Sequence, residues 1–208
     1  MSAVRSTVFN LSPGALETVG PSIGKLRSGC FLYHGYFTGT PHTSEPPLCV
    51  QKCDVGSSSS RTVAQVVREV TLLKQFSKLN RNVAHFEGAI YDEANKQVLI
   101  AMGCKSCFSL RAAVLEFTMP WDLRLHLCQD IAGALEAIHG AQMVHRSLSP
   151  LTIFIDSKWH AFVGGFSETV TEKESQGGNA DEGLVVTLEN AYCAPEQAMH
   201  AAHGFAAD

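Results

Sequence analysis

The residues of this chain that could do chemistry gather in one stretch, His145-Arg146-Ser147-Leu148-Ser149-Pro150-Leu151-Thr152-Ile153. Its hydroxyl side chains are neutral groups that donate and accept hydrogen bonds but take up a proton poorly. Magnesium is a hard cation that prefers carboxylate oxygens, and this stretch contains no acid. A base or a metal ligand for the loop would have to come from acids that follow it in the sequence, such as Asp156, Glu168 and Glu172.

The stretch resembles the catalytic loop of protein kinases, whose pattern is H-R-D-L-K-P-x-N-I. In that loop an Asp accepts the proton of the substrate hydroxyl and an Asn holds a magnesium ion. The resemblance places Ser147 at the Asp, Ser149 at the Lys and Thr152 at the Asn, while the framing residues of the motif are kept. The loop therefore has the outline of a phosphotransferase without its chemical side chains.

Five further segments resemble protein kinase motifs in the order of the family. They are residues 24–31 for the glycine-rich loop, 49–52 for V-A-I-K, 68–73 for the helix with the glutamate partner of that lysine, 162–167 for Asp-Phe-Gly and 193–196 for Ala-Pro-Glu. Leu26 replaces the second glycine of the loop, and Gly165 stands at the metal-binding Asp. Asp208 matches the Asp that opens the central C-lobe helix. From about residue 23 to its last residue, the chain resembles a catalytically degraded kinase, or pseudokinase.

This resemblance implies the fold and the division of the chain. The expected fold class is α+β, a protein kinase-like two-lobe fold with a strand-rich N-lobe and an incomplete helical C-lobe. The expected parts are a flexible N-terminal lead-in over residues 1–19, the N-lobe over 20–103 and a partial C-lobe over 104–208 that ends at the start of its central helix. We expect the chain to be a fragment of a longer protein, because the remaining C-lobe helices would follow Asp208.

The composition excludes several classes of protein. Hydrophobic residues make up 45% of the chain and charged residues 17%, which suits a globular protein with a core. A net charge of −4 indicates no nucleic-acid partner, and no apolar run reaches the roughly 18 residues of a membrane helix. Seven scattered cysteines argue against a secreted disulfide framework. No signal peptide is visible, so we expect an intracellular, cytoplasmic protein.

Hydrophobic periodicity predicts the elements that position these motifs. Two short strands around a glycine turn are expected over residues 23–37, and further strands over 48–53 and 98–101. Thr62 and Gln65 can form a capping box for a helix, which follows a polar hinge at 57–60. Pro120 opens a second helix. Residues 153–155 and 161–163 are expected to pair as a hairpin, so strands dominate the first half and helices the second.

The resemblance also implies a nucleotide site with altered residues. Lys52 and Glu69 are expected to pair, and the lysine would hold phosphates. The residues that would cover the adenine are Phe31, Val50 and Phe154, all bulkier than those of the family. The candidate nucleotide-binding set is completed by Gly24, Gly29, Gly103 and Cys104. We predict no metal site and no cofactor, with ATP binding without magnesium as the open alternative.

The groups that hold the shape of a kinase are better kept than those that do chemistry. Leu73, Phe86, His145 and Phe166 match the four side chains that the family stacks across its assembled lobes. The sequence therefore favours a scaffold or an allosteric regulator whose partner is another protein, such as an active kinase or the remainder of its own chain. The alternatives are a divergent ATP-binding kinase with weak phosphotransferase activity, and a nucleotide sensor without turnover.

The second predicted helix, which begins at Pro120, has an apolar stripe that must be buried against other elements. Its apolar stripe consists of Leu127, Ile131, Leu135 and Ile138. In the family the central C-lobe helix packs beside it. We therefore expect this stripe to lose part of its cover and to leave an exposed apolar patch.

Overall fold

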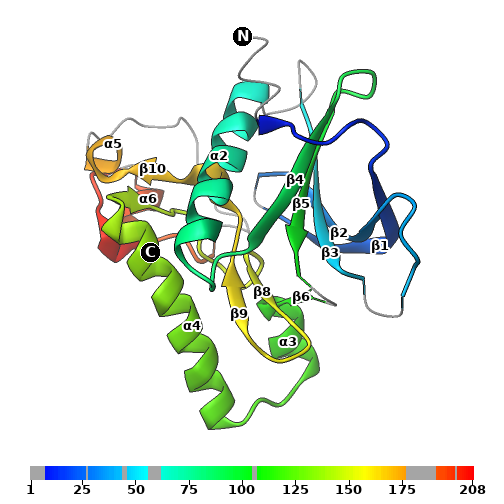
Figure 1. The fold of residues 1–208 in the computed structure, drawn as a ribbon. Coiled ribbons are helices and arrows are strands. Elements are labelled where there is room, and N and C mark those ends of the chain that lie inside the picture. Colours follow the sequence, from blue (N-terminus) through cyan, green and yellow to red (C-terminus); the bar gives the residue numbers. More distant parts are fainter. Residues whose placement is uncertain are drawn as a thin grey trace.

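The computed structural model describes residues 8–26, 28–43, 46–55, 62–104, 107–176, 191–199 and 201–208. A five-stranded antiparallel sheet forms the first part of the fold, with the strand order β1-β2-β3-β5-β4. Its strands are β1 (Leu16–Lys25), β2 (Phe31–Phe37), β3 (Leu48–Asp54), β4 (His85–Asp92) and β5 (Gln97–Gly103). The helix α2 (Val63–Leu79) lies beside this sheet, as Figure 1 shows.

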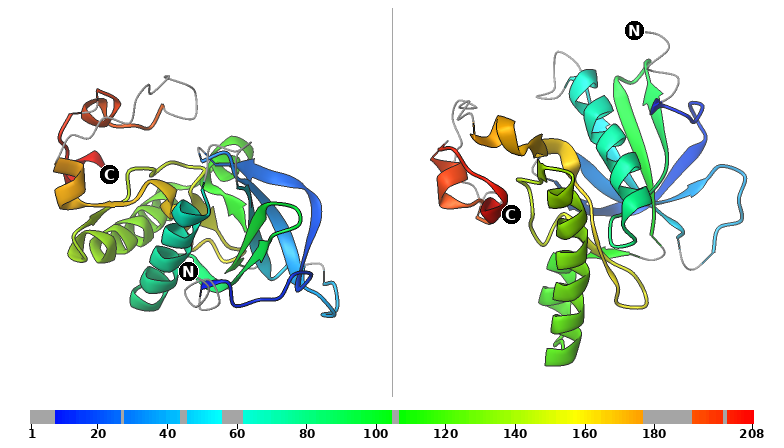
Figure 2. Two further views of the ribbon diagram at one scale, coloured as in Figure 1. Left: turned by 90° about the horizontal axis from the view of Figure 1, so that it is seen from above. Right: turned by 60° about the vertical axis from the view of Figure 1, so that its left-hand side comes forward.

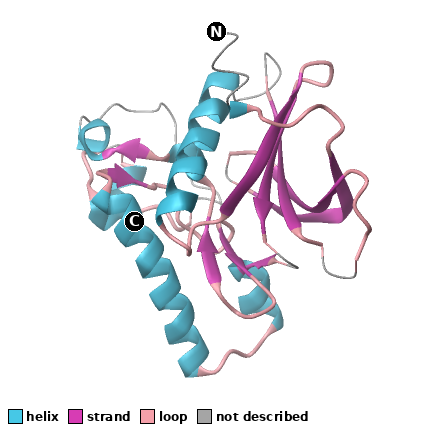
Figure 3. Cartoon of the chain, in the orientation of Figure 1, coloured by secondary structure: helices cyan, strands magenta, loops and turns pink. Residues whose placement is uncertain are grey.

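The second part of the fold carries most of the helices, as the colouring in Figure 3 makes plain. It begins with β6 (Phe108–Ser109), α3 (Leu110–Glu116), α4 (Trp121–Gly140), β7 (Met143–Val144), β8 (Ile153–Ile155) and β9 (Ala161–Val163). Short elements follow as η1 (Phe166–Glu168), β10 (Val170–Thr171), α5 (Glu172–Gln176), α6 (Pro195–Ala198) and η3 (Phe205–Ala207). The division into a strand-rich and a helical lobe confirms the predicted two-lobe kinase-like fold.

Local sequence explains where α2 begins and which face it buries. The Thr62 hydroxyl accepts a hydrogen bond from the Gln65 backbone, and the Gln65 side chain accepts one from the Thr62 backbone. This capping box satisfies backbone donors that a helix start leaves without partners. The helix then buries one apolar face, in which Val66, Val70 and Phe76 are almost inaccessible to solvent. The predicted helix start is confirmed.

The helix α4 begins directly after Pro120, also as predicted, and extends away from the sheet along the second lobe (Figure 2). Its stripe is better covered than expected, because it packs onto β9 and α2. Leu127 and Ile138 are buried, while Ile131 and Leu135 are half-buried. The expectation that this stripe is exposed is therefore wrong for its two ends. A group of exposed apolar side chains lies instead around the end of α3 and the start of α4, namely Val114, Leu115, Phe117, Trp121 and Leu125.

The N-terminal boundary differs from the prediction. β1 begins at Leu16, which is buried, rather than at Ile23. Before it, the Leu11 backbone donates to the Ala89 carbonyl, and the Asn10 side chain accepts from the Ala89 backbone. Residues 8–19 therefore belong to the folded lobe and are not a flexible lead-in. Residues 1–7 and the predicted hinge at 57–60 lie outside the described residues.

One apolar cluster joins the two lobes. It contains Leu32 from β2, Phe76 from α2, Phe154 from β8 and Phe166 from η1. The predicted hairpin forms as β8 and β9, with Ile153 opposite Val163 and Ile155 opposite Ala161. This hairpin forms the floor below the sheet, so the residues predicted to bind nucleotide lie where the lobes meet. Among the described residues, no helix combines the length and the apolar composition needed to cross a bilayer.

Candidate functional site

The loop that resembles a catalytic loop is held by a buried carboxylate. Asp208 accepts hydrogen bonds from the backbone N–H groups of His145, at 2.6 Å, and Arg146, at 2.7 Å. The His139 ring nitrogen lies 3.0 Å from the same carboxylate. Hydrogen bonds to a charged group are strong, so these contacts brace the entrance of the loop. Burial lowers the pKa of His145, whose Nε2 lies 3.0 Å from the Gly164 carbonyl.

The hydroxyl of Thr152 is already engaged by the loop itself. Thr152 Oγ1 lies 2.9 Å from the Ser147 carbonyl and 3.1 Å from the Ser149 carbonyl, and it accepts from the Ser149 N–H at 3.0 Å. The residue is buried. Because one hydroxyl has one proton and two lone pairs, these bonds use most of its capacity. Thr152 therefore braces the loop through hydrogen bonds to its backbone.

The position of the missing metal-binding Asp is closed by packing. Gly165 has φ +76°, a left-handed conformation that favours glycine. A Cβ added to Gly165 would lie 2.6 Å from the Thr152 methyl carbon Cγ2. A similar restriction applies to Gly164, whose added Cβ would lie 2.8 Å from Phe154 Cε2. Of the two positions that hold magnesium in the family, one is therefore a glycine, and the Thr152 methyl group occupies the space that a side chain at residue 165 would need.

The later acids do not gather around the loop. Asp156 lies in the turn between β8 and β9, where it accepts from the Lys158 and His160 backbones. Glu168 ends η1, and Glu172 begins α5. Within the described residues, no cluster of three or more His, Cys, Asp or Glu side chains has the arrangement that a metal ion needs. The sequence hypothesis that one of these acids replaces the missing ligands gains no support from this geometry.

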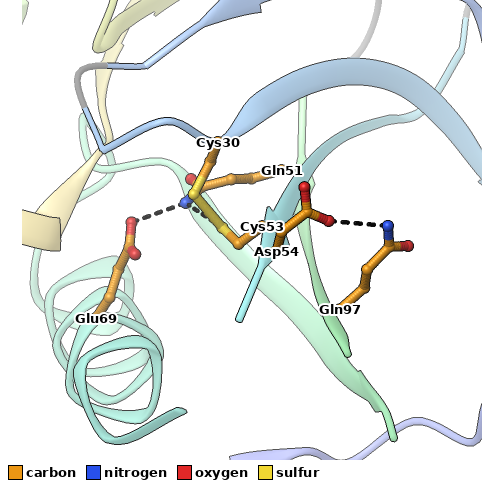
Figure 4. The surroundings of a disulfide bond; sticks show 6 residues. All are labelled: Cys30, Gln51, Cys53, Asp54, Glu69 and Gln97. Carbon is orange, nitrogen blue, oxygen red and sulfur yellow. Dashed lines mark hydrogen bonds between the residues drawn. A yellow bond between two sulfur atoms is a disulfide. The ribbon is translucent and has the colours of Figure 1, made fainter. Parts of the chain in front are cut away.

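The prediction that Lys52 pairs with Glu69 is wrong, because the neighbouring residue Gln51 is the partner of Glu69. Gln51 donates from Nε2 to Glu69 Oε1 at 3.0 Å, and both side chains are 2% exposed (Figure 4). Successive strand residues point to opposite faces, so Lys52 faces away from α2. The pKa of Asp92 is lowered by hydrogen bonds from Asn95 and, more weakly, by the Lys52 ammonium. A neutral amide thus occupies the place of the family's phosphate-binding lysine.

The same one-residue slip affects two of the three residues expected to cover the adenine. Phe31 is 40% exposed, whereas its neighbour Leu32 is 1% exposed and belongs to the inter-lobe cluster. Val50 packs on the outer face of the sheet with Ile90, while Cys49 faces the inter-lobe cluster. The roof residues are therefore Leu32 and Cys49, and the predictions for Phe31 and Val50 are wrong.

Phe154, the residue expected below the adenine, is buried in the inter-lobe cluster. Leu26, Leu32, Cys49 and Phe154 belong to one cluster, and none is more than 2% exposed. Gly24 pairs with Leu32 in the β1–β2 ladder, and Gly29, with φ +79°, closes the turn between these strands. Because Leu26 replaces a glycine of the phosphate-binding loop, its side chain packs into the core where the family leaves backbone exposed.

The segment that links the lobes is also engaged. Gly103 ends β5, and an added Cβ there would lie 2.6 Å from Glu87 Oε1. The Cys104 backbone N–H donates to the Pro47 carbonyl at 3.1 Å, so it is not available to a ligand. Hydrogen bonding with Cys107 and burial raise the pKa of the Cys104 and Cys49 thiols. The hydrogen bonds from those two thiols lower the pKa of Cys107.

The predicted stack across the lobes is present in its central part. The rings of His145 and Phe166 lie 5.1 Å apart in an edge-on arrangement. Leu73 is buried in the same cluster, and Phe86 packs at its edge. Sequence reasoning missed Phe76, whose ring stacks on Phe166 at 5.6 Å and ties α2 to the second lobe. Its helical spacing from Leu73 and Leu72 was the available signal.

A disulfide between Cys30 and Cys53 was also missed. The scattered, odd number of cysteines argued against such bonds in the sequence. The bond joins the end of the β1–β2 turn to β3, and five other cysteines are free thiols.

Comparison with known proteins agrees with this geometry. Residues 22–208 match the family model described as protein tyrosine and serine/threonine kinase. This match covers most of the chain, and the chain therefore belongs to the protein kinase family. Because its loop lacks the catalytic Asp and both magnesium ligands, it is a pseudokinase-like member.

Three relatives illustrate the range of similarity. The non-functional pseudokinase ZED1 of Arabidopsis thaliana is 30% identical over an alignment of 125 residues that covers 48% of this chain and 36% of that protein. Wall-associated receptor kinase-like 4 of the same plant is 31% identical over 117 residues, covering 52% of this chain and 15% of the relative. The L-type lectin-domain containing receptor kinase VIII.1 of Arabidopsis thaliana is 24% identical over 154 residues, covering 72% of this chain and 20% of the relative. The chain thus spans between 15% and 36% of the length of these three relatives.

Proposed function

We propose that this chain is a pseudokinase domain that acts through protein contacts, as a scaffold or an allosteric regulator, with little or no phosphoryl transfer. The packing of Thr152 against Gly165 carries this proposal. At these two positions the family holds magnesium, whereas here a hydroxyl bonded to its own loop meets a glycine without space for a side chain. Where the family has its two magnesium ligands, this chain therefore has residues that pack closely and hydrogen-bond within the loop.

The expected loss of activity is large. A positioned general base typically contributes about 10²–10⁴ in rate, and Ser147 supplies none. The metal ion adds several kcal/mol of charge stabilisation in the transition state. Gln51 further replaces an ammonium with a neutral amide, so the β3 strand offers the phosphates no cation. Leu26, Leu32, Cys49 and Phe154 are buried in one cluster between the lobes, which supports weak nucleotide binding or none.

The groups that hold shape support the second half of the proposal. Asp208 braces the loop, and the Phe76, Phe166 and His145 rings connect the lobes. A buried charge with strong hydrogen bonds stays only where the structure compensates its desolvation. A domain that keeps these contacts without the catalytic groups is suited to presenting a fixed surface. The proposed partner is another protein, such as an active kinase or the remainder of its own chain, and any ATP would bind without magnesium.

Phosphotransfer assays test the enzymatic half. Labelled ATP with Mg²⁺ or Mn²⁺ and a generic protein acceptor should give the same incorporation for the wild type and for a Ser147→Ala variant. Incorporation by the wild type that the Gln51→Ala or Ser147→Ala change abolishes would refute the proposal.

Complementation tests the scaffold half. In cells that lack the protein, Ser147→Ala should restore function, because it leaves the packing unchanged. Phe166→Ala should fail, because it removes the ring that joins α2 to the loop. Equal rescue by both variants, or rescue by Phe166→Ala alone, would contradict a role that depends on the assembled shape.

A further inference from the structure

The disulfide lies at the point where the family's nucleotide phosphates meet the sheet. Cys30 directly follows the β1–β2 turn, which is closed by a hydrogen bond from the Leu26 backbone to the Cys30 carbonyl at 2.8 Å. Cys53 lies in β3, with its Cα 4.5 Å from that of Cys30 and 23 residues further along the chain. This Cα separation is within the range that disulfides require. The bond therefore fastens the glycine-rich turn to β3 (Figure 4).

The contacts of Gln51 connect the disulfide to α2. Gln51 Nε2 donates to Cys53 Sγ at 3.4 Å and to Glu69 Oε1 at 3.0 Å. All four groups in this series, Cys30, Cys53, Gln51 and Glu69, are buried. Because buried side chains are closely packed, a change in the position of the Cys53 sulfur displaces Gln51. The amide that holds the Glu69 carboxylate thus rests directly against the disulfide.

We propose that Cys30 and Cys53 form a redox modification site, and that its state controls how firmly the first turns of α2 are held. In the oxidised state the disulfide holds the turn, β3 and Gln51 together. A dithiol reductant donates two electrons and two protons: one of its thiolates attacks a disulfide sulfur, and its second thiol displaces the mixed disulfide. The products are two cysteine thiols and the cyclic disulfide of the reductant.

Reduction changes the space that the two sulfur atoms need. They must separate from bonding distance to van der Waals contact, and neither Cys30 nor Cys53 has solvent around it to absorb the shift. Gln51 is the polar neighbour that moves, which weakens its bond to Glu69. The far end of α2 keeps an independent anchor, because Phe76 stacks on Phe166. The effect is therefore restricted to the start of the helix.

The reductant has a route to the buried bond. Gly29 is exposed, and nothing lies within 4 Å of the Cβ position at this residue. Outward opening of this turn, which also exposes the Leu26 side chain, would bring the Cys30 sulfur to solvent. This predicts that reduction is limited by local opening of the turn, and that it proceeds without global unfolding.

Hydrogen exchange measured on the intact protein tests the proposal. The oxidised protein and the same protein treated with dithiothreitol are compared by mass spectrometry, with peptide mapping to confirm the Cys30–Cys53 link. We expect amides of residues 63–70 to exchange at least about tenfold faster after reduction, since a hydrogen bond to a buried carboxylate is lost. Amides at the end of α2, around Phe76, should change little. The unfolding equilibrium should shift roughly 10²-fold toward the unfolded state.

Two variants provide the controls. Cys128→Ser removes an exposed thiol outside the site, and its response to dithiothreitol should equal that of the wild type. The double variant Cys30→Ser with Cys53→Ser should show the fast exchange with and without reductant. The proposal is overturned if peptide mapping of air-oxidised protein finds Cys30 and Cys53 as thiols. It is equally overturned if the link is present but reduction leaves exchange at residues 63–70 unchanged.

Discussion

The substitution Gly165→Ala is the most direct perturbation of the closed metal position. It adds a single methyl group at a residue with φ +76°. That methyl carbon would lie 2.6 Å from Thr152 Cγ2 and 3.1 Å from Thr152 Cβ. The first distance is far below van der Waals contact, so the Thr152 methyl group or the backbone at Gly165 must move.

Two separate costs add up to the expected destabilisation. A non-glycine residue in the left-handed region costs about 1–2 kcal/mol. Overpacking a well-filled core costs about 1–3 kcal/mol. Gly165→Ala should therefore lower the free energy of unfolding by about 2–5 kcal/mol, a large part of the roughly 5–15 kcal/mol of a typical domain.

The variant Thr152→Ser separates the two costs. It removes the blocking methyl carbon but keeps the hydroxyl that bonds to Ser147 and Ser149. Alone it should cost about 0.5–1.5 kcal/mol, the usual effect of deleting one buried methyl. In the Thr152→Ser background the 2.6 Å contact is gone and the 3.1 Å contact with Cβ remains, so Gly165→Ala should cost mainly the backbone term, about 1–2 kcal/mol. Urea unfolding of the four proteins gives the coupling energy, provided that the m value stays constant.

A coupling below about 0.5 kcal/mol would refute this reasoning, because residues without shared packing add within that limit. It would mean that Thr152 does not close the Gly165 position. The structural basis for the missing metal ligand would then have to lie elsewhere.

Three further predictions follow from the site. Gln51→Ala should lower the free energy of unfolding by about 1.5–3 kcal/mol, because it removes a hydrogen bond to the buried Glu69 carboxylate. Lys52→Ala should change the free energy of unfolding by less than about 0.5 kcal/mol. If urea unfolding finds Lys52→Ala to be the more destabilising variant, Lys52 and not Gln51 is the partner of Glu69. Asp208→Asn replaces one accepting oxygen with an NH₂ group, so one of the His145 and Arg146 backbone N–H groups loses its acceptor. The free energy of unfolding should fall by about 1–3 kcal/mol. An unchanged melting temperature would contradict a stabilising role of Asp208 at the loop. Burial lowers the pKa of His145, so below about pH 6.5 the unfolded chain binds a proton at this residue that the folded chain does not bind. The free energy of unfolding should therefore fall as the pH drops below about 6.5, and His145→Leu should flatten this part of the pH dependence. An unchanged slope of the free energy of unfolding against pH in His145→Leu would contradict the assignment.

Signals that act along the chain were predictable from the sequence. The capping box at Thr62 and the proline before α4 fix helix starts through neighbouring residues only. The hairpin of β8 and β9 was predicted with its observed ends, because two short apolar runs flank a polar turn. The order of the kinase motifs then placed these elements in one fold.

Properties that depend on contacts across the fold were not predictable in the same way. In β3, Cys49 and Val50 are both small and apolar, so composition does not tell which of them faces the cleft. A one-residue shift exchanges the two faces of a strand, and only the position of Glu69 opposite Gln51 decides between them. The disulfide between Cys30 and Cys53 has the same origin, because spacing alone does not determine cysteine pairing.

β4 was missed because its buried part is short. It consists of Gly88, Ala89 and Ile90, which carry little side-chain signal. The glycine contacts Leu11, whose segment had been assigned to the lead-in.

The central proposal is that the site between the lobes does not bind a nucleotide together with a metal ion. Isothermal titration of the chain with ATP and Mn²⁺ tests it most directly, with Phe154→Ala as a variant that reopens the floor of the cleft. We expect no saturable heat for the wild type up to millimolar nucleotide, with or without Mn²⁺. Saturable binding by the wild type at micromolar ATP that strengthens when Mn²⁺ is added would contradict the account.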